Sequence, residues 1–160
     1  MTVEKHIVDS KDSFGGWLEE FYPGQVFKHW PGKTITEMDN HLFSLLTMND
    51  NPLHTDENYM SSHQHGKTLV NGLLVLSLVV GMSVRQTSGK AIANLLYESV
   101  THDGPTFHGD TIYAESEVLE VTASRSRDDR GTVYIESRAI NQRGEKVLTM
   151  RRKFLTKKKP

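Results

Sequence analysis

Residues 69–84 read LVNGLLVLSLVVGMSV, and this stretch decides the fold. Asn71 is a good helix N-cap, because its side chain accepts hydrogen bonds from the unpaired N–H groups of a first turn, and it predicts a helix from Gly72 to about Arg85. Apolar side chains stand on every face of this helix, which is typical of a buried helix. The stretch is shorter than the ~20 apolar residues of a membrane-spanning helix, and polar residues and glycines interrupt it. We therefore expect a buried helix and no membrane contact.

After Gly89 the helical period gives way to stretches that favour β-strands, at residues 92–100, 111–121, 132–140 and 147–156. The last two are joined by Asn-Gln-Arg-Gly at 141–144, a hairpin turn signal. One apolar helix followed by long antiparallel strands predicts an α+β hot-dog fold, with the sheet wrapped around the central helix. One small sheet does not cover a helix that is apolar on every face. We therefore expect a homodimer, or a higher assembly of dimers, that pairs edge to edge.

The first part of the chain predicts shorter elements. Residues 1–16 are expected to be a loose segment, and residues 25–30 a short strand broken by Pro31-Gly32. Thr36 and Asp56 are predicted N-caps of two further short helices. The length of 160 residues suits a single domain over residues 1–160.

The composition excludes several classes of function. Lys plus Arg number 19 and Asp plus Glu 20, and this near-neutral balance argues against a nucleic-acid-binding protein. The absence of cysteine excludes a thiol nucleophile and any cysteine-ligated metal site, and it fits a reducing, cytoplasmic location. His63-Gln64-His65 lacks a third ligand at suitable spacing, and the sequence has no Gly-rich phosphate loop. We therefore expect no metal and no nucleotide cofactor.

Polar residues that could carry chemistry gather in the segment that leads to the buried helix. Asn49, Asp50 and Asn51 share one tight turn, and His54 follows two residues after a proline that stiffens the backbone. Histidine is the side chain most readily poised for proton transfer near neutral pH. The free N–H groups where the helix starts at Gly72 can hold a developing oxyanion. From spacing alone, a capped loop with a surface histidine is an equal alternative.

The segment at residues 43–56, FSLLTMNDNPLHTD, resembles the hydratase motif of the MaoC-like dehydratases, the (R)-specific enoyl-CoA hydratases. That motif reads roughly F-x-x-L-[ST]-G-D-x-N-P-[LI]-H-x-D. Residues 69–72 resemble the family's [IL]-x-H-G helix start and residues 108–111 its P-G-D-T turn, in order over most of residues 20–156. The resemblance implies a hot-dog fold and a hydro-lyase that reversibly hydrates an enoyl-CoA to a 3-hydroxyacyl-CoA. It implies no separate cofactor, because coenzyme A is part of the acyl-CoA substrate.

The resemblance also implies roles for individual residues. His54 takes the role of general acid and base, and the Gly72 amide that of holding the thioester oxygen. Asn51 keeps a polar role in orienting water. Asn71 stands where the family has the histidine of its helix start, and there it would contact the substrate.

Two departures from the family motif fall in the turn before His54. The family's glycine aligns with Met48 and its catalytic aspartate with Asn49, whose amide does not titrate in this range. Three alternatives follow. Asn49 only orients water while His54 does the acid/base work, or Asp50 supplies the missing carboxylate, or the site binds a ligand without hydrating it.

The Leu-Thr-Met-Asn version of the motif resembles a MaoC-like subgroup that acts on branched, carboxylated thioesters, the mesaconyl-CoA hydratases or β-methylmalyl-CoA dehydratases. Such a substrate would repel a second carboxylate, so Asn49 in place of aspartate makes electrostatic sense. Arg85 and Arg152 are candidates for gripping the substrate carboxylate, and Lys67 with the C-terminal lysines for meeting the coenzyme A phosphates. The structural alternatives are arginines that snorkel or support an interface, and a solvated lysine.

Two other functions stay open. A hot-dog acyl-CoA thioesterase would hydrolyse the same thioester, but it needs a water-activating group near the helix start, where Asn71 is a poor candidate. A non-catalytic acyl-CoA-binding module predicts binding without turnover. The histidines His41, His102 and His108 are expected on the surface or in turns.

Overall fold

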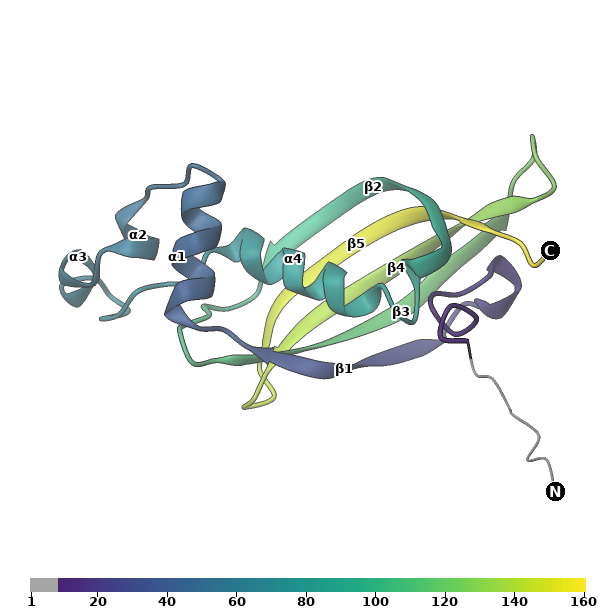
Figure 1. Ribbon diagram of the computed structural model, residues 1–160. Helices are drawn as coiled ribbons and strands as arrows, with labels where there is room; N and C mark the ends of the chain where they lie inside the picture. The colour runs from purple at the N-terminus through teal and green to yellow at the C-terminus, as the bar shows by residue number, and fades with distance from the viewer. Residues whose placement is uncertain (1–8) are drawn as a thin grey trace, which may run out of the picture.

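The computed structural model describes residues 9–160 and shows an antiparallel sheet that curves around one central helix (Figure 1). The sheet has five strands in the order β1-β3-β4-β5-β2. Their bounds are Val26–Thr34 for β1, Ala91–His102 for β2, Thr111–Ala123 for β3, Arg130–Asn141 for β4 and Lys146–Lys157 for β5. The helix α4 (Gly72–Ser83) crosses the inner face of the sheet, which confirms the predicted α+β arrangement.

The other elements are short. They are η1 (Leu18–Glu20), α1 (Glu37–Leu46), α2 (Pro52–Thr55), α3 (Glu57–Ser61) and η2 (Ser88–Lys90). The helices α1, α2 and α3 form a group beyond the sheet, at the end where α4 begins (Figure 1). Both predicted N-caps are confirmed. The Thr36 hydroxyl accepts the N–H of Asp39 at 3.2 Å, and the Asp56 carboxylate accepts the N–H of Tyr59 at 2.8 Å.

The main core lies between α4 and the inner face of the sheet. Its buried residues from α4 and the strands include Leu74, Val75, Val79, Ile112, Ala114, Ala139, Leu148 and Met150. The opposite side of α4 is uncovered in the single chain, where Leu73 is 54% exposed. In one chain the sheet therefore covers only one side of the helix, as expected for a helix that is apolar on every face.

The strand β2 forms one edge of the sheet. It pairs with β5 and with no other strand among residues 9–160. Apolar side chains on it are exposed, among them Leu95, Leu96 and Tyr97. An edge strand of this kind offers unpaired N–H and C=O groups, together with apolar surface, to a further strand. No helix within residues 9–160 has the length and hydropathy that crossing a bilayer requires.

The first strand is longer than its sequence predicts. β1 continues through Pro31-Gly32 to Thr34, and its pairing with β3 shifts register between His29 and Lys33. An edge strand tolerates proline at such an irregularity, because the missing N–H need not join the ladder. The expected break at Pro31 is therefore a local bulge.

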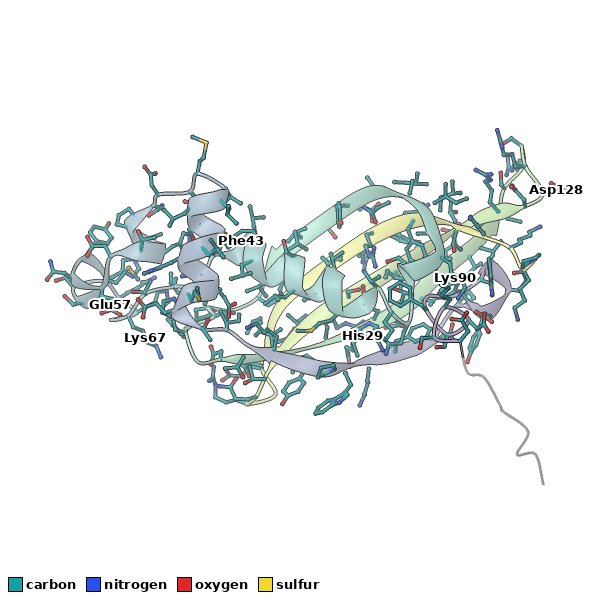
Figure 2. All side chains as sticks on the ribbon, viewed as in Figure 1. His29, Phe43, Glu57, Lys67, Lys90 and Asp128 are labelled. Atoms are coloured by element: carbon teal, nitrogen blue, oxygen red, sulfur yellow. The ribbon has the colours of Figure 1, made fainter. Side chains whose placement is uncertain are left out.

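The expected loose segment at residues 1–16 is wrong for its second half, and residues 1–8 lie outside the described part of the chain. The ammonium of Lys90 donates hydrogen bonds to the carbonyls of Asp12, Phe14 and Gly15 at 3.1, 2.9 and 2.7 Å. Figure 2 shows Lys90 beside this segment. The N–H groups of Gly15 and Gly16 also donate to the carbonyls of Arg85 and Thr87, at 2.7 and 3.0 Å, so side-chain and backbone bonds together hold this segment.

Candidate active site

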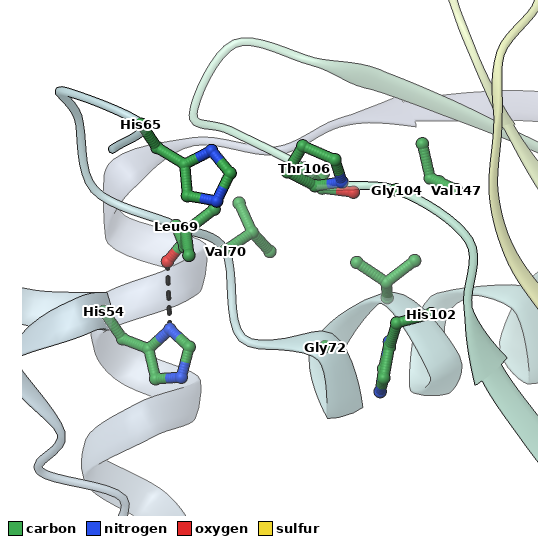
Figure 3. Close-up of a pocket in the computed structure, with 11 residues that line it drawn as sticks. His54, His65, Leu69, Val70, Gly72, His102, Gly104, Thr106 and Val147 are labelled. Atoms are coloured by element: carbon green, nitrogen blue, oxygen red, sulfur yellow. Dashed lines mark hydrogen bonds between the residues drawn. The ribbon is translucent and has the colours of Figure 1, made fainter. Parts of the chain in front are cut away.

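A cavity of about 420 Å³ opens at the N-terminal end of α4 (Figure 3). Its walls come from α2, the loop before α4, the start of α4, the end of β2 and the loop that follows β2. The lining residues are His54, His65, Leu69, Val70, Gly72, Val75, His102, Gly104, Pro105, Thr106 and Val147. The walls are mainly apolar with a few imidazole and backbone polar groups, which is typical of a small-molecule site.

His54 stands in this cavity with one ring nitrogen fixed. The turn before it is capped, because the side chain of Asn51 accepts the N–H of Leu53 at 3.0 Å and starts α2. The Nδ1 atom of His54 lies 3.0 Å from the carbonyl oxygen of Leu69 (Figure 3). A carbonyl only accepts, so Nδ1 carries the proton and Nε2 is left as the basic nitrogen. Nε2 has no hydrogen-bond partner among residues 9–160, so it is available to a water or a substrate.

The N–H groups at the start of α4 differ in whether they have a hydrogen-bond acceptor. The N–H of Asn71 is accepted by Asn40 Oδ1 at 2.8 Å, and that of Leu73 by Asn71 Oδ1 at 3.0 Å. The N–H of Gly72, which lies between them, has no acceptor within the described residues. A free N–H at a helix N-terminus, supported by the helix dipole, suits a developing negative charge on an oxygen.

Asn71 adds a second free donor beside that N–H. The side chain is 2% exposed, and its Nδ2 has no partner within residues 9–160. A buried amide without a partner carries a desolvation cost that a bound acceptor would relieve. Gly72 and His54 line the cavity, whereas Asn71 does not, so its Nδ2 is a buried unpaired donor in the residue next to Gly72.

Two further histidines line the cavity. His102 was expected on the surface or in a turn, and it is exposed; it is the last residue of β2 and lies against Gly72 (Figure 3). His65 comes from the polar loop after α3. Their placement depends on strand register and loop path, so no local motif in the sequence signals it. No group of His, Asp or Glu side chains within residues 9–160 is arranged to hold a metal ion.

The turn before α2 does not line the cavity. The side chain of Asn49 accepts the N–H of Asn51 at 3.3 Å, and Asp50 is exposed. Met48 has φ of 57°, a left-handed conformation that glycine adopts most easily. That conformation agrees with the alignment that puts the family's glycine at Met48 and hence its aspartate at Asn49.

The structure does not bring the predicted arginines to the cavity within one chain. Arg85 and Arg152 lie at the C-terminal end of α4, about 17 Å along the helix from Gly72 by the ordinary rise per residue. Arg152 is 2% exposed and donates to Ser83 Oγ at 2.9 Å and Ser88 Oγ at 3.1 Å. Burial lowers the pKa of its guanidinium. The end of a helix carries partial negative charge, so Arg152 sits where the helix dipole favours a cation.

Lys67 lies on the outer surface of the helical group, away from the sheet (Figure 2). Its ammonium is 4.0 Å from the centre of the Phe107 ring, and the Phe107 ring in turn contacts His65 with the ring centres 5.9 Å apart. His65 lines the cavity, so Lys67 is connected to a residue of the cavity wall through the Phe107 ring.

Comparisons with known sequences show the family to which the chain belongs. The profile of the family described as MaoC like domain matches residues 20–140. The chain is 28% identical over 149 residues to a mesaconyl-CoA hydratase from Cereibacter sphaeroides, and 30% identical over 152 residues to a beta-methylmalyl-CoA dehydratase from Chloroflexus aurantiacus. Those alignments cover 93% and 95% of this chain but 43% of each relative, so the chain spans less than half their length. It is also 32% identical over 107 residues to an (R)-specific enoyl-CoA hydratase from Aeromonas caviae, covering 67% of this chain and 75% of that relative.

Solved structures give the same fold. A protein described as a monoamine oxidase regulatory protein from Archaeoglobus fulgius superposes with a TM-score of 0.80 at 32% identity, over 91% of this chain and 97% of that one. A Mycobacterium tuberculosis protein described as having a double hotdog fold superposes with a TM-score of 0.82 at 23% identity, over 91% of this chain and 45% of that one. These likenesses confirm the hot-dog prediction.

Proposed function

Because the chain belongs to the MaoC-like domain family, we propose that it is a hydro-lyase that reversibly hydrates an enoyl-CoA to a 3-hydroxyacyl-CoA. The observation that carries the proposal is that one cavity is lined by a residue with an unpaired imidazole nitrogen and by a residue with an unpaired backbone donor. These residues are His54 and Gly72, and neither Nε2 of His54 nor the Gly72 N–H has a partner among residues 9–160. Addition of water to a thioester-conjugated double bond needs a base for the water and a donor for the enolate oxygen.

The mechanism follows from these two groups. A water gives a proton to Nε2 of His54 while its oxygen bonds to C3 of the enoyl group. The π electrons of the C2–C3 bond move toward the thioester, and the enolate oxygen accepts from the Gly72 N–H. The His54 imidazolium then returns the proton to C2 on the same face. Water is added syn, and His54 is regenerated as a neutral base.

The turn before α2 orients the water in this proposal. Asn49 and Asn51 already fix the turn through their side-chain bonds to the backbone. Asn49 stands at the family's aspartate position, so in this proposal His54 carries the acid/base work. Asn49 does not line the cavity in the single chain, so it would have to turn toward the cavity, or act through Asn51, to orient the water. Asp50 is the alternative source of a carboxylate, but it is exposed and would have to turn inward.

For the acyl group we propose a branched, carboxylated chain such as mesaconyl. Support comes from Asn49, since a neutral amide there spares a substrate carboxylate from like-charge repulsion. Two relatives of similar sequence are named for such substrates. Lys67, which contacts the Phe107 ring beside the cavity residue His65, is proposed to bind a phosphate of coenzyme A. The distant Arg85 and Arg152 would reach the acyl carboxylate only if a second copy brought them there.

A homodimer is proposed as the smallest working unit. The exposed edge of β2 and the uncovered side of α4 leave apolar surface that a second copy can bury. Relatives of more than twice this length, one of them described as a double hotdog, suggest that a second domain occupies this place there. Size-exclusion chromatography with light scattering tests this, and an 18.1 kDa monomer at micromolar concentration would contradict it.

An activity panel tests the function itself. Crotonyl-CoA, mesaconyl-CoA and a saturated acyl-CoA are incubated with the protein, and loss of the conjugated absorbance is followed beside release of free thiol. Hydration of mesaconyl-CoA in preference to crotonyl-CoA supports the proposal, and a clear preference for crotonyl-CoA removes the carboxylated substrate. Thiol release from every substrate would favour the thioesterase alternative. Binding with no turnover of any substrate would favour the non-catalytic module.

A further inference from the structure

The buried side-chain amide of Asn40, on α1, forms hydrogen bonds both to His54 and to the residue before Gly72. Asn40 is fully buried, at 0% exposure, and neither the cavity wall nor the hydratase motif includes it. Its Oδ1 accepts the N–H of Asn71 at 2.8 Å. Its Nδ2 donates to the carbonyl oxygens of His54 and Leu69, both at 3.1 Å, and faces Nε2 of His108 at 2.9 Å. Polar groups this deep in a protein need partners, and the four partners of Asn40 come from three segments: α2, the loop before α4 and the loop after β2.

One of these partners also fixes the catalytic ring. The Leu69 carbonyl accepts from Asn40 Nδ2 at 3.1 Å and from His54 Nδ1 at 3.0 Å. A carbonyl has two lone pairs, so it can serve both donors. Asn40 therefore sets the position of the acceptor that keeps the proton on Nδ1 and leaves Nε2 of His54 basic.

The other end of the amide reaches the start of α4. By accepting the N–H of Asn71, Asn40 orients the residue immediately before Gly72. The Gly72 N–H, which follows it, has no acceptor within the described residues. A single side chain thus ties α2, the loop before α4 and the N-terminus of α4 into one arrangement.

Both hydrogens on Nδ2 of Asn40 are engaged in hydrogen bonds. Its NH₂ group has two of them for three acceptors, so at least one is shared. Burial lowers the pKa of His108, which keeps its ring neutral and able to accept. Any replacement of Asn40 therefore leaves a buried acceptor without a donor, at the point where the base and the oxyanion donor are aligned.

We propose that Asn40 is a positioning residue that holds the tautomer of His54 and the orientation of the Gly72 N–H together. This inference rests on the proposed hydratase function for its kinetic part, but the tautomer of His54 can be measured without any substrate. A misplacement of a base by about 1 Å can cost on the order of 10²-fold in rate, so loss of the amide is expected to lower kcat far more than it changes KM.

The test compares Asn40→Ala and Asn40→Asp with Ser44→Ala. Ser44 lies one turn further along α1, is 1% exposed, and its hydroxyl has no partner within the described residues, so it is a matched buried control. Its carbonyl accepts the N–H of Asn49 at 2.9 Å, but a change of the side chain to alanine keeps that backbone bond. Asn40→Asp keeps the acceptor for Asn71 but replaces the NH₂ donor. It is also the variant to use if the alanine variant fails to fold.

Nitrogen-15 NMR of labelled histidine reports the His54 tautomer, with assignment by His54→Gln. We expect a dominant Nδ1–H form in the native chain and in Ser44→Ala, and a mixed or inverted population in both Asn40 variants. Their kcat is expected to fall between ~10-fold and ~100-fold with KM changed less than ~3-fold. An unchanged tautomer and kcat in a folded Asn40 variant would overturn the proposal. If the native chain hydrates no substrate, the hydratase function fails, and the NMR comparison still decides the role of Asn40.

Discussion

The imidazole of His102 occupies the space that a β-carbon on Gly72 would need. A β-carbon built there would lie 2.8 Å from Nδ1 and 2.9 Å from Nε2 of His102, and closer still to Cε1. The end of β2 and the start of α4 therefore approach each other as closely as only glycine permits. Glycine at this position serves the packing of the cavity wall as well as access to its N–H.

The first prediction separates these two roles of Gly72. Alanine in a helix is usually more stable than glycine by about 0.5–1 kcal/mol, but we expect Gly72→Ala to lower the free energy of unfolding because His102 is pushed aside. Adding His102→Ala should recover that stability, with a coupling of about 0.5 kcal/mol or more between the two sites. Hydratase activity should stay low in the double variant, because the new methyl still shields the N–H. Additive changes in unfolding free energy would contradict the predicted contact.

The second prediction concerns His54. Its replacement by alanine removes the only proposed acid/base, so turnover should fall by about 10²-fold or more. His41→Ala is the control, since His41 lies on α1 outside the cavity and its ring faces Glu37. Initial rates with the preferred substrate decide the matter. Equal rates for the two variants would move the chemistry away from His54.

The third prediction decides between the two neighbours in the turn. Asn49 fixes the turn by accepting the N–H of Asn51, whereas Asp50 is exposed. We expect Asn49→Ala to lower turnover at least ~10-fold and Asp50→Ala to change it less than ~2-fold, because oriented water is worth on that order in general acid/base catalysis. The reverse result would mean that Asp50 turns inward and supplies the carboxylate.

How far the sequence predicts this molecule depends on the range of the contacts involved. The helix at residues 72–83 and the caps Thr36, Asp56 and Asn71 follow from local patterns, because each involves residues within one or two turns. The hot-dog class follows from one apolar helix and the strands after it. The family motif also places His54 and Gly72 on the correct elements.

The rest of the site depends on contacts between distant segments. Asn40 lies 14 residues from His54 and 31 from Asn71, and nothing in its neighbourhood distinguishes it from an exposed polar residue on a helix. His102 reaches the cavity only because β2 runs to its end in register with β5, and bulges shift that register along the way.

The fourth prediction concerns pH and the buried His29. Its ring is 4% exposed, with Nδ1 at 3.0 Å from Gln86 Oε1 and Nε2 at 2.9 Å from Ser116 Oγ. Burial lowers the pKa of His29, the nearby charge of Arg152 lowers it further, and the bond to Gln86 opposes both. His29 therefore binds a proton near pH ~6.5 in the unfolded chain, but only at a lower pH in the folded chain.

The contribution of His29 to the free energy of unfolding is accordingly complete above pH ~6.5. It is lost as the pH falls from there through the lowered pKa of His29 in the folded state. Urea unfolding at fixed protein concentration from pH 7.5 to 5.5 measures this. The free energy of unfolding of His29→Gln should depend less on pH than that of the native chain, because the other histidines are the same in the two proteins. Parallel curves would mean that His29 is not the source.

The fifth prediction tests whether Arg152 has anything to do with the substrate. The hydroxyl hydrogens near it are already donated elsewhere, from Ser83 to the Val80 carbonyl and from Thr87 to the Ser83 carbonyl. Arg152→Met therefore removes a buried charge without stranding a donor, and the free energy of unfolding should stay level or rise by about 1 kcal/mol. Arg152→Ala leaves a cavity and should lower it by about 2–4 kcal/mol.

Neither variant should change the ratio of kcat/KM for mesaconyl-CoA to that for crotonyl-CoA, because Arg152 lies at the far end of α4 from Gly72. An arginine that gripped the acyl carboxylate would instead contribute a charged hydrogen-bond pair, and its loss would lower that ratio by about 10-fold or more. Such a selective loss in the folded Arg152→Met protein would require a second copy to carry the guanidinium into the cavity of its partner. The selectivity ratio and the unfolding curve together therefore separate a helix-end cation from a substrate ligand.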